Sequence, residues 1–336
     1  MAGITLINLQ NGTFEISENG QTLREQRRED FLKYQLPFEY DPSARCPLFD
    51  KYLQRVLPDT DCCKVLAEYM GYIFTTGLKL EKAAILYGSG ANGKSVFFEV
   101  VNALIGPDNI CSYSLQNLTK YDSYQRAELS NKLLNYASEI NGKLEASIFK
   151  QLVSGEPVEA RQIYGRPFVM REYGKLMFNC NELPKEVENT NAFFRRFLII
   201  PFDSVIPESE QDPELAAKII RDELSGVFNW MLEGLGRLLQ QRTFTRSAII
   251  REQVEDFRRE SDSVAMFLDE GGYKPDPQSC MLLKDLFYDY RSFCYENGYT
   301  PCSLKTVSKR LKNAGYKTER RAPGYTVYIA KSVESM

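Results

Sequence analysis

The chain has 336 residues, of which 43% are hydrophobic and 26% charged, and these values are typical of a folded globular protein. It contains no histidine, which excludes imidazole acid–base catalysis, histidine-based triads and histidine-ligated metals. A formal net charge of −3 argues against a chain coated throughout in nucleic-acid-binding surface, and the eight cysteines form no C-x-x-C pair of the kind that zinc sites use.

The length predicts two or three domains. No stretch approaches the ~20 apolar residues that cross a bilayer, and no N-terminal signal is visible. Scattered, unclustered cysteines are typical of a reducing compartment. We therefore expect a cytoplasmic protein without a membrane partner.

The first 80 residues combine short strands with helices. Strands are predicted at Ile4–Leu9 and Thr13–Ile16, on either side of a turn at Asn11-Gly12. The pattern from Phe49 to Leu80 is helical, and Pro58 is expected to break it.

The middle of the chain alternates apolar strands with helical patterns, which predicts an α/β domain. Ala83–Tyr87 is suited to a buried strand, and a helix is predicted to follow at Ser95–Leu104. Leu215–Gln240 is strongly helical. Three later strands are predicted at Leu133–Ala137, Leu176–Phe178 and Phe197–Ile200.

The segment Gly88–Ser95 reads GSGANGKS and matches G-x-x-x-x-G-K-[ST], the phosphate-binding loop. Its glycines let backbone N–H groups turn toward phosphate oxygens. Lys94 is expected to reach the β and γ phosphates, and Ser95 to ligate Mg²⁺. A strand before the loop and a helix after it make this signal strong, and they predict ATP and Mg²⁺ as cofactors. The residues expected to bind the nucleotide are Gly88, Gly90, Asn92, Gly93, Lys94 and Ser95.

Polar residues follow two of the predicted strands, where groups that assist the loop would lie. Glu139 follows Leu133–Ala137 and is expected to serve the metal or the attacking water. Asn181 follows Leu176–Phe178 and could orient water or contact the γ phosphate. Each signal alone is weak, because polar residues commonly follow apolar strands.

Arg195 and Arg196 precede the strand Phe197–Ile200 instead of following it. If that strand is parallel to the others, the arginines lie at the edge of the sheet opposite the chain's own phosphates. They could then complete only a neighbouring subunit's site, as a trans arginine finger does. The alternative is a pair of surface arginines that only stabilises the fold.

Residues Ser303–Lys331 hold eight basic residues against one acidic residue, a net charge of +7. The region 262–330 resembles a winged helix, with helices at Leu282–Tyr295 and Ser303–Ala314 before two strands. The second helix would contact DNA; a basic face on a protein-binding domain is the alternative. The residues expected to contact DNA here are Lys305, Lys309, Lys312, Arg320 and Arg321.

The ordered motifs resemble the superfamily 3 helicases, in the poxvirus-type and phage/plasmid primase-helicase branch, over nearly the whole chain. The similar segments are Tyr40–Pro47 in the N-terminal region, Leu86–Ser95 as Walker A, Leu133–Glu139 as Walker B, Phe149–Arg161 as motif B′, Phe178–Pro184 as motif C and Phe194–Phe202 as the arginine-finger segment. Two positions depart from the family pattern. Glu156 stands where Asp is usual, and Ser138 stands where many members have a second acid.

The resemblance implies an AAA+-like P-loop ATPase core in a hexameric homo-oligomer that moves 3′→5′ on single-stranded DNA. It implies Asn181 as the sensor residue and Arg196, which abuts the strand, as the finger. It also places a DNA-contacting hairpin between motifs B′ and C, where Arg166 is expected at the tip; an ordinary solvated turn is the alternative. A primase or polymerase partner, forked DNA as substrate and a bacterial host cell or virus-infected cell are consistent with this branch.

These features predict three domains: an N-terminal, mainly helical collar at 1–80, the ATPase domain at 81–245 and a C-terminal winged-helix domain at 246–336. No primase domain precedes Met1, so we expect a stand-alone helicase or the helicase portion of a larger protein. The predicted function is a DNA helicase of phage, plasmid or mobile-element replication. The alternatives are an ATP-switched origin-binding initiator that melts DNA without processive unwinding, and a small-molecule P-loop kinase, which the +7 tail disfavours.

Overall fold

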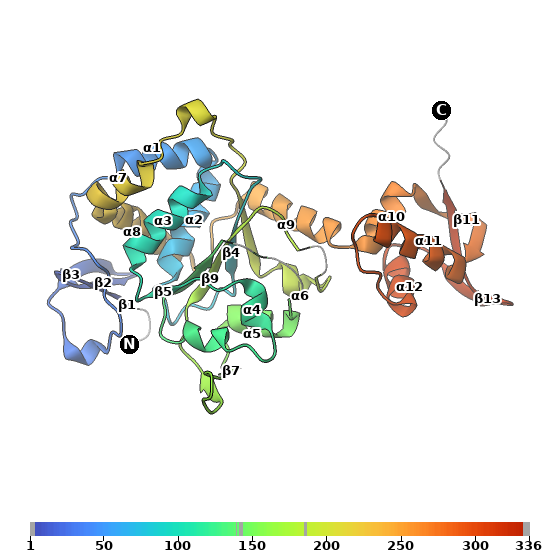
Figure 1. The fold of residues 1–336 in the computed structure, drawn as a ribbon, viewed down its shortest axis with the longest axis horizontal. Coiled ribbons are helices and arrows are strands. Elements are labelled where there is room, and N and C mark those ends of the chain that lie inside the picture. The colour runs from blue at the N-terminus through green and yellow to red at the C-terminus, as the bar shows by residue number, and fades with distance from the viewer. Residues whose placement is uncertain (1–3, 139, 141–143, 185–186, 332–336) are drawn as a thin grey trace. The chain divides into compact units, whose positions relative to one another are not determined.

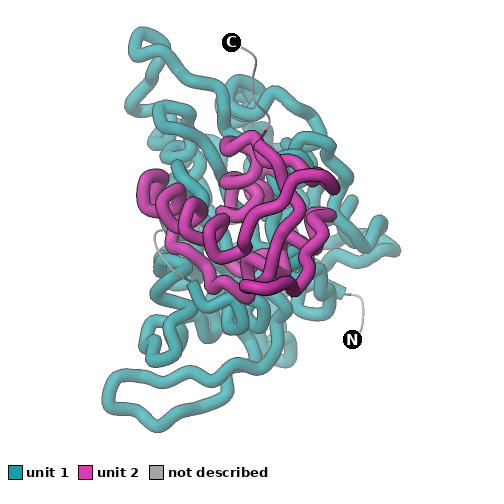
Figure 2. The backbone as a smooth tube through the Cα atoms, turned by 90° about the vertical axis from the view of Figure 1, so that its right-hand side faces the viewer, with its two compact units in different colours: residues 1–183, 190–254 teal, residues 184–189, 255–336 magenta. Residues whose placement is uncertain are grey.

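The computed structural model describes residues 4–138, 140, 144–184 and 187–331. The chain divides into two compact units, residues 1–183 with 190–254 and residues 184–189 with 255–336 (Figure 2). Helix α9 (Ala248–Glu260) contains the point where the chain passes from unit 1 to unit 2. Within the described ranges, no helix is both long and apolar enough to cross a bilayer.

A five-stranded, fully parallel sheet forms the centre of unit 1, with the order β10-β4-β9-β6-β5 (Figure 1). The strands are β4 (Ala83–Tyr87), β5 (Ile110–Cys111), β6 (Leu134–Ala137), β9 (Lys175–Cys180) and β10 (Phe197–Pro201). Every residue of β6 and β10 is buried, as expected for strands covered on both faces. This architecture fits the predicted α/β P-loop core, and only the two-residue β5 had no counterpart in the prediction.

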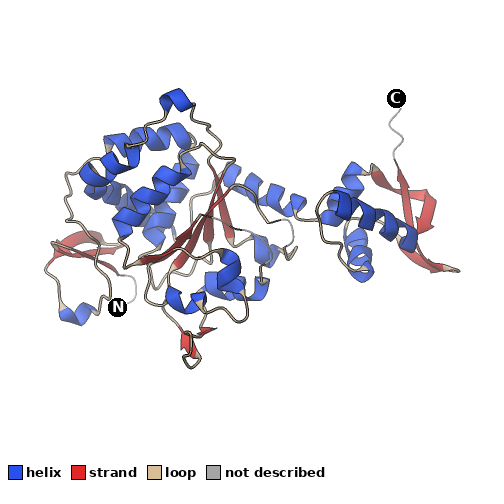
Figure 3. Cartoon of the chain, in the orientation of Figure 1, coloured by secondary structure: helices blue, strands red, loops and turns tan. Residues whose placement is uncertain are grey.

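Helices lie on both sides of the central sheet (Figure 3). They are α1 (Pro47–Val56), α2 (Thr60–Tyr72), α3 (Lys94–Ile105), α4 (Leu115–Thr119), α5 (Ala146–Ser154), α6 (Asn191–Phe194), α7 (Leu215–Asp222) and α8 (Leu224–Gln241), with 3-10 turns η1 (Arg28–Asp30), η2 (Gln125–Leu129) and η3 (Glu208–Glu210). Pro58 separates α1 from α2, as predicted.

The helix predicted at Leu215–Gln240 is instead two helices, α7 and α8, which meet at Glu223. The Glu223 carboxylate is buried and accepts hydrogen bonds from the backbone N–H groups of Leu48 and Phe49, both at 3.0 Å. These N–H groups belong to the first turn of α1 and have no partner within the helix. The break therefore places a carboxylate at the positive end of another helix, a contact that no local pattern could reveal.

Helices α2 and α8 approach so closely that glycine is required at their contact. A Cβ on Gly234 of α8 would lie 2.3 Å from the backbone carbonyl of Ala67 in α2, and one on Gly71 of α2 would lie 2.6 Å from the Leu235 Cβ. In contrast, a Cβ on Gly236, two residues further along α8, would meet nothing within 4 Å. Gly236 is therefore a matched control for Gly234.

We expect Gly234→Ala to lower the free energy of unfolding by about 1–3 kcal/mol, because the new methyl group must push the two backbones apart. Gly236→Ala should raise it by about 0.5–1 kcal/mol, because alanine favours the helix and the space is open. Urea unfolding of both variants checks the pair. Equal effects at the two positions would contradict the close packing of α2 on α8.

Two smaller antiparallel sheets complete unit 1. The N-terminal sheet has the order β1-β2-β3 and contains β1 (Thr5–Leu9), β2 (Gly12–Ser17) and β3 (Gly20–Arg24). The other sheet is a hairpin of β7 (Val158–Ala160) and β8 (Phe168–Met170). The hairpin leaves the main body of unit 1 beside α4 and α5 (Figure 1).

Unit 2 has its own hydrophobic core, formed by three helices and a three-stranded sheet of order β11-β13-β12. The elements are α10 (Ser263–Glu270), β11 (Tyr273–Leu282), α11 (Leu283–Glu296), α12 (Leu304–Asn313), β12 (Thr318–Arg321) and β13 (Gly324–Lys331). The Asp262 carboxylate caps α10 and also accepts a hydrogen bond from Arg310 of α12 at 2.8 Å. The helices α11 and α12 and the strands β12 and β13 lie where they were predicted, whereas β11 was not predicted.

Candidate nucleotide-binding site and basic surfaces

The loop between β4 and α3 has a backbone that only small residues adopt easily. The φ angles of Gly90 and Gly93 are +119° and +82°, and Ala91 is left-handed at +48°. A run of such residues turns successive backbone N–H groups inward and creates an anion-binding concavity. Because Lys94 begins α3, the positive end of that helix faces the same space.

Two glycines of the loop are required by close packing. A Cβ on Gly88 would lie 2.2 Å from Asn92 Nδ2 and 2.3 Å from the carbonyl oxygen of Phe202. A Cβ on Gly93 would lie 2.9 Å from Tyr52 Cε2 of α1, whose hydroxyl donates a 2.8 Å hydrogen bond to the Gly93 carbonyl. The loop is therefore held between β10 and α1 with no room for a side chain at either position.

The charged and polar groups of the loop fit a phosphate. Lys94 is buried, and its ammonium donates to the Gly88 carbonyl at 2.6 Å and to Asn92 Oδ1 at 2.9 Å. Burial lowers the pKa of Lys94, whereas nearby Cys180 and Asp203 raise it. Asn92 Nδ2 is buried and has no hydrogen-bond partner among the described residues. An unpartnered donor beside an ammonium and a helix N-terminus is suited to a triphosphate.

The end of β9 lies beside the phosphate loop, because the Gly88 N–H donates to the Cys180 carbonyl at 3.1 Å. Asn179 is buried and its Oδ1 accepts a 2.7 Å hydrogen bond from Tyr136 of β6, so this amide is engaged within the sheet. Asn181 comes just after the strand and is exposed. Of the two amides, Asn181 is therefore the exposed one, and its predicted role as the sensor stays a prediction.

The acid predicted to follow β6, Glu139, lies outside the described residues. Ser138, the residue before it, is exposed beyond the end of β6. Since β9 lies between β4 and β6, the carboxyl ends of these three strands face the same edge of the sheet. Ser95, the predicted magnesium ligand, lies in the first turn of α3 and is exposed.

Sequence reasoning missed Asp203, which lies on the other side of the loop. The segment after β10 follows the phosphate loop through two backbone hydrogen bonds, from Phe202 N–H to Tyr87 O at 2.6 Å and from Ile206 N–H to Ala91 O at 2.8 Å. Asp203 between them is exposed, and its charge raises the pKa of Lys94. It is an acid after an apolar strand, the same signal that selected Glu139, so the sequence did contain the clue.

The arginine pair precedes β10 and lies at the amino ends of the parallel strands, whereas the phosphate loop lies at their carboxyl ends. Strand β10 is parallel to β4, with Phe197 paired to Ala83 and Pro201 to Tyr87. Arg196 is therefore level with Lys82, six residues before Gly88, and at ~3.3 Å per residue it lies about 20 Å along the strand from the start of the chain's own phosphate loop. Because β10 is parallel to the other strands, the arginines lie away from the chain's own loop, as a trans arrangement requires.

The two arginines have different environments. Arg196 is only 8% exposed, and its guanidinium contacts the Ala192 carbonyl, Ser154 Oγ at 3.0 Å and the Glu81 carboxylate at 3.3 Å. The Arg195 side chain is 50% exposed and pairs with the same Glu81. Although Arg196 was the predicted finger, Arg195 is the one whose guanidinium reaches the surface.

The hairpin places Arg166 differently from the prediction. Its turn is closed by a 2.9 Å hydrogen bond from the Gly165 N–H to the Gln162 carbonyl, so Ile163 and Tyr164 are the central turn residues. Arg166 is exposed on the segment that leads back to β8, and the expectation that it forms the tip is wrong. The Gly-Arg-Pro sequence suggested a turn at 165–167, but the hydrogen bond closes the turn earlier.

In unit 2, the predicted lysines surround one hollow of about 740 Å³. Its lining comprises Leu283, Leu304, Lys305, Thr306, Ser308, Lys309, Lys312 and Tyr325. Most of these residues belong to α12, and Tyr325 belongs to β13. The lining combines apolar side chains with those of three lysines.

The predicted arginines of β12 lie on opposite faces of the strand. Arg320 pairs directly with Tyr325, so its side chain lies on the same face as this lining residue of the hollow. Arg321 projects to the other face, where it pairs with Glu319 at 3.3 Å and stacks over the Tyr328 ring at 5.4 Å. The structure therefore groups Arg320, but not Arg321, with the lysines of α12.

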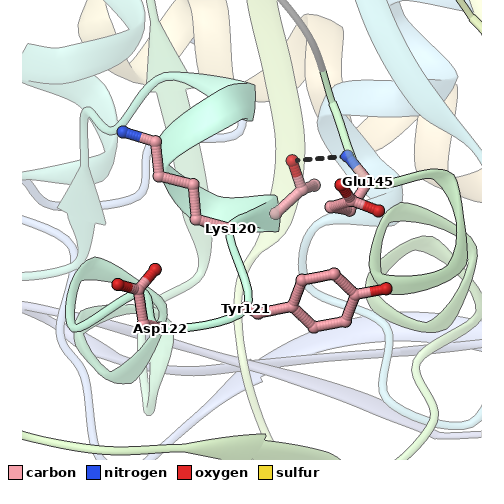
Figure 4. A pocket seen from close by; sticks show the side chains of 5 residues that line it. Lys120, Tyr121, Asp122 and Glu145 are labelled. Atoms are coloured by element: carbon pink, nitrogen blue, oxygen red, sulfur yellow. Dashed lines mark hydrogen bonds between the residues drawn. The ribbon is translucent and has the colours of Figure 1, made fainter.

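A second, smaller hollow of about 260 Å³ lies at the end of α4 (Figure 4). Thr119, Lys120, Tyr121, Asp122 and Glu145 line it, and the Glu145 N–H donates to Thr119 Oγ1 at 3.3 Å. Its five described lining residues include no glycine, and one of them, Glu145, directly precedes the nine-residue helix α5. The loop 88–95 therefore remains the candidate nucleotide site.

Two family models match the chain. The model described as "D5 N terminal like" matches residues 2–58, and a family of unknown function, DUF5906, matches residues 86–196. The second match covers the phosphate loop, β6, the hairpin, β9 and the arginine pair.

Curated relatives include two viral proteins. "Putative helicase 121R" of Invertebrate iridescent virus 3 is 24% identical and covers 88% of this chain, which spans 35% of that protein. "Putative helicase L207/L206" of Acanthamoeba polyphaga mimivirus is 25% identical over 59% of this chain and 22% of its own length. The chain thus spans about a third or less of these relatives.

Among solved structures, the C-terminal region of NrS-1 in its A form without ligand has a similar fold. The TM-score is 0.51 at 12% identity, covering 98% of this chain and 96% of that one. A second structure of the same region, residues 305–718, gives a TM-score of 0.50 at 13% identity. The two family models, the helicase-named viral relatives and this shared fold together support the assignment of the chain to the primase-helicase-like superfamily 3 helicases.

Proposed function

We propose that this chain is an ATP-dependent DNA helicase of a phage, plasmid or other mobile-element replication system, using Mg²⁺ as cofactor. The observation that carries the proposal is the phosphate loop at the carboxyl edge of a parallel sheet, with a buried ammonium and an unpartnered Asn92 donor. The helicase-named relatives support nucleotide use and a role in replication.

This proposal gives roles to the groups near the loop. Lys94 and the loop N–H groups stabilise the negative charge that develops on the β and γ phosphates, and the Ser95 hydroxyl would hold Mg²⁺. Asn181 orients the attacking water, and Glu139 would hold the metal or accept the proton of the water. Asp203 is an added acid at the loop, on the side away from Asn181.

The arginine pair acts on the ATP of a neighbouring subunit, which requires a homo-oligomer; we propose a hexameric ring, as in the family. We assign the contact to Arg195, because its guanidinium is half exposed, and we assign Arg196 to holding the segment through Ser154 and Glu81. A ring with sites between subunits links each hydrolysis to movement of one protomer against the next. We propose 3′→5′ translocation on single-stranded DNA.

Two basic surfaces are proposed to contact DNA. Arg166 on the hairpin would hold a phosphate in a contact that does not depend on sequence. In unit 2, which we propose to be a winged helix, Lys305, Lys309 and Lys312 of α12 would contact the duplex of a forked substrate together with Arg320. Arg321, paired with Glu319, would contribute less.

Unwinding of a forked duplex tests the proposal. The purified chain should separate a long forked duplex with a 3′ single-stranded arm in the presence of ATP and Mg²⁺. It should fail with a 5′ arm and with a non-hydrolysable ATP analogue. Duplex binding and local melting without strand separation would favour the origin-binding initiator instead, and ATP turnover that DNA does not affect would favour a small-molecule kinase.

For unit 2 we expect Lys309→Ala/Lys312→Ala to weaken duplex binding and to reduce the slope of log affinity against log salt by about two, because each lost phosphate contact removes roughly one unit. Lys274→Ala, an exposed lysine of β11 outside the hollow, is the control and should leave the slope unchanged. Fluorescence anisotropy over a salt series measures both. An unchanged slope in the double variant would remove this surface from the proposed DNA interface.

A further inference from the structure

The tip of the β7–β8 hairpin is an ordered turn. The Gly165 N–H donates to the Gln162 carbonyl at 2.9 Å, and Arg161 Nε donates to the Gly165 carbonyl at 3.1 Å. These bonds hold the backbone of the turn, whose two central residues are Ile163 and Tyr164.

The residues at the centre of this turn are unfavourable for folding. Tyr164 is 100% exposed and Ile163 is 65% exposed, so neither side chain gains stability from burial. Tyr164 also has a φ of +59°, a left-handed conformation that glycine or asparagine adopts with less strain. An apolar, strained and fully exposed ring at the end of a hairpin indicates a contact with something outside the subunit.

The charge around the tip selects an anionic partner. From Ala160 to Met170 the chain holds no acidic residue, and Arg161 and Arg166 are both exposed beside the turn. A contact with an apolar protein surface would need the exposed ring but not the two arginines. The combination of an exposed aromatic ring with arginines on both sides is the one that binds single-stranded nucleic acid, in which bases stack on the ring and phosphates meet the guanidinium groups.

The base of the hairpin is anchored firmly to unit 1. The buried guanidinium of Arg126 donates to the Glu159 carbonyl in β7 and to the Leu118 carbonyl in α4, both at 2.9 Å. Val158 and Met170, which are paired across the hairpin, are both buried. A platform held in this way loses little conformational freedom when it binds a ligand, which favours stacking.

We propose that Tyr164, supported by Ile163, stacks against an unpaired base of single-stranded DNA, in addition to the phosphate contact assigned to Arg166. This inference rests on the proposed DNA-binding function and deepens it. The hairpin then holds the strand through its bases as well as its backbone, so it distinguishes unpaired DNA from duplex. Any base offers a face for stacking, and the contact remains independent of sequence.

The test compares the binding of the full chain to a thymidine oligonucleotide and to an abasic strand of equal length, which keeps the phosphates and lacks the bases. Tyr164→Ala, Tyr164→Phe and Tyr164→Gly are measured beside the wild type by fluorescence anisotropy. Phe31→Ala is the matched control, because Phe31 is also an exposed aromatic residue, at 82%, with a positive φ of +51°. Tyr164→Gly relieves the strain, so its thermal stability should be no lower than that of the wild type.

We expect Tyr164→Ala and Tyr164→Gly to bind the thymidine strand about tenfold more weakly, and Tyr164→Phe and Phe31→Ala to bind it as the wild type does. On the abasic strand all variants should bind alike. Equal weakening of Tyr164→Ala on both strands, or no weakening on either, would overturn the stacking contact while leaving DNA binding intact. A wild-type chain that binds neither strand would overturn the proposed function and this inference with it.

Discussion

Replacing Lys94 by alanine is expected to abolish ATP hydrolysis, with a fall in turnover of about 10²–10³-fold or more. The ammonium of Lys94 is the buried positive charge of the phosphate loop, and it donates to Gly88 and Asn92 within that loop. Without it, the phosphate loop stabilises the negative charge that develops during hydrolysis with its backbone N–H groups and the helix N-terminus but with no ammonium of its own. A steady-state ATPase assay with single-stranded DNA present measures the effect.

The control for Lys94→Ala is Lys120→Ala, which removes a lysine from the hollow at the end of α4. We expect that variant to hydrolyse ATP at the wild-type rate. Circular dichroism of Lys94→Ala should match the wild type, because the Lys94 ammonium donates to Gly88 and Asn92 of the loop itself. If Lys120→Ala lost activity and Lys94→Ala kept it, the nucleotide would lie at the end of α4 and the assignment of the loop would fail.

The second large effect is expected from the arginine pair. Arg195→Ala should lower ATP hydrolysis by about 10³–10⁵-fold without preventing nucleotide binding, because a trans arginine stabilises charge in the transition state. Mixing Arg195→Ala with Lys94→Ala subunits should restore part of the activity. In such a ring, some interfaces combine an intact loop from one subunit with an intact arginine from the next.

Arg196→Ala separates a catalytic role from a structural one. Since Arg196 is buried against Ser154 and Glu81, its loss should lower the thermal stability as well as the activity, whereas Arg195→Ala should leave the stability close to that of the wild type. If Lys94→Ala subunits recovered activity when mixed with Arg196→Ala but not when mixed with Arg195→Ala, Arg196 would be the trans arginine. No recovery in either mixture, in rings shown to contain both variants, would contradict a shared site.

The phosphate loop was predictable because its signal is local. A single continuous segment, Gly88–Ser95, carries the glycines, the lysine and the hydroxyl, and the preceding strand and following helix are strongly patterned. The strands β4, β6, β9 and β10 were likewise visible as apolar runs. The two-residue β5 is too short for any periodic signal. Strand β11 contains Pro275 and Pro277, and because proline is rare within strands the sequence did not indicate a strand there.

Features that depend on contacts between distant residues could not be predicted. The exposure of Arg195 and the burial of Arg196 follow from contacts with Glu81 and Ser154, which no pattern in the segment reveals. Strand alternation places Arg320 and Arg321 on opposite faces, but which of the two shares a face with Tyr325 depends on the register of β12 with β13. Glu223 interrupts a helical pattern because its carboxylate caps α1, 175 positions earlier in the chain.

ATP turnover by the purified full chain, measured with and without single-stranded DNA over a range of protein concentrations, tests the central claim most directly. If neighbouring protomers share each nucleotide site and use ATP to move along a DNA strand, the rate of ATP hydrolysis per protomer should rise as subunits assemble. It should rise again when single-stranded DNA is added. A chain that stays monomeric at every concentration and hydrolyses ATP at one rate, whether or not DNA is present, would contradict the proposed function.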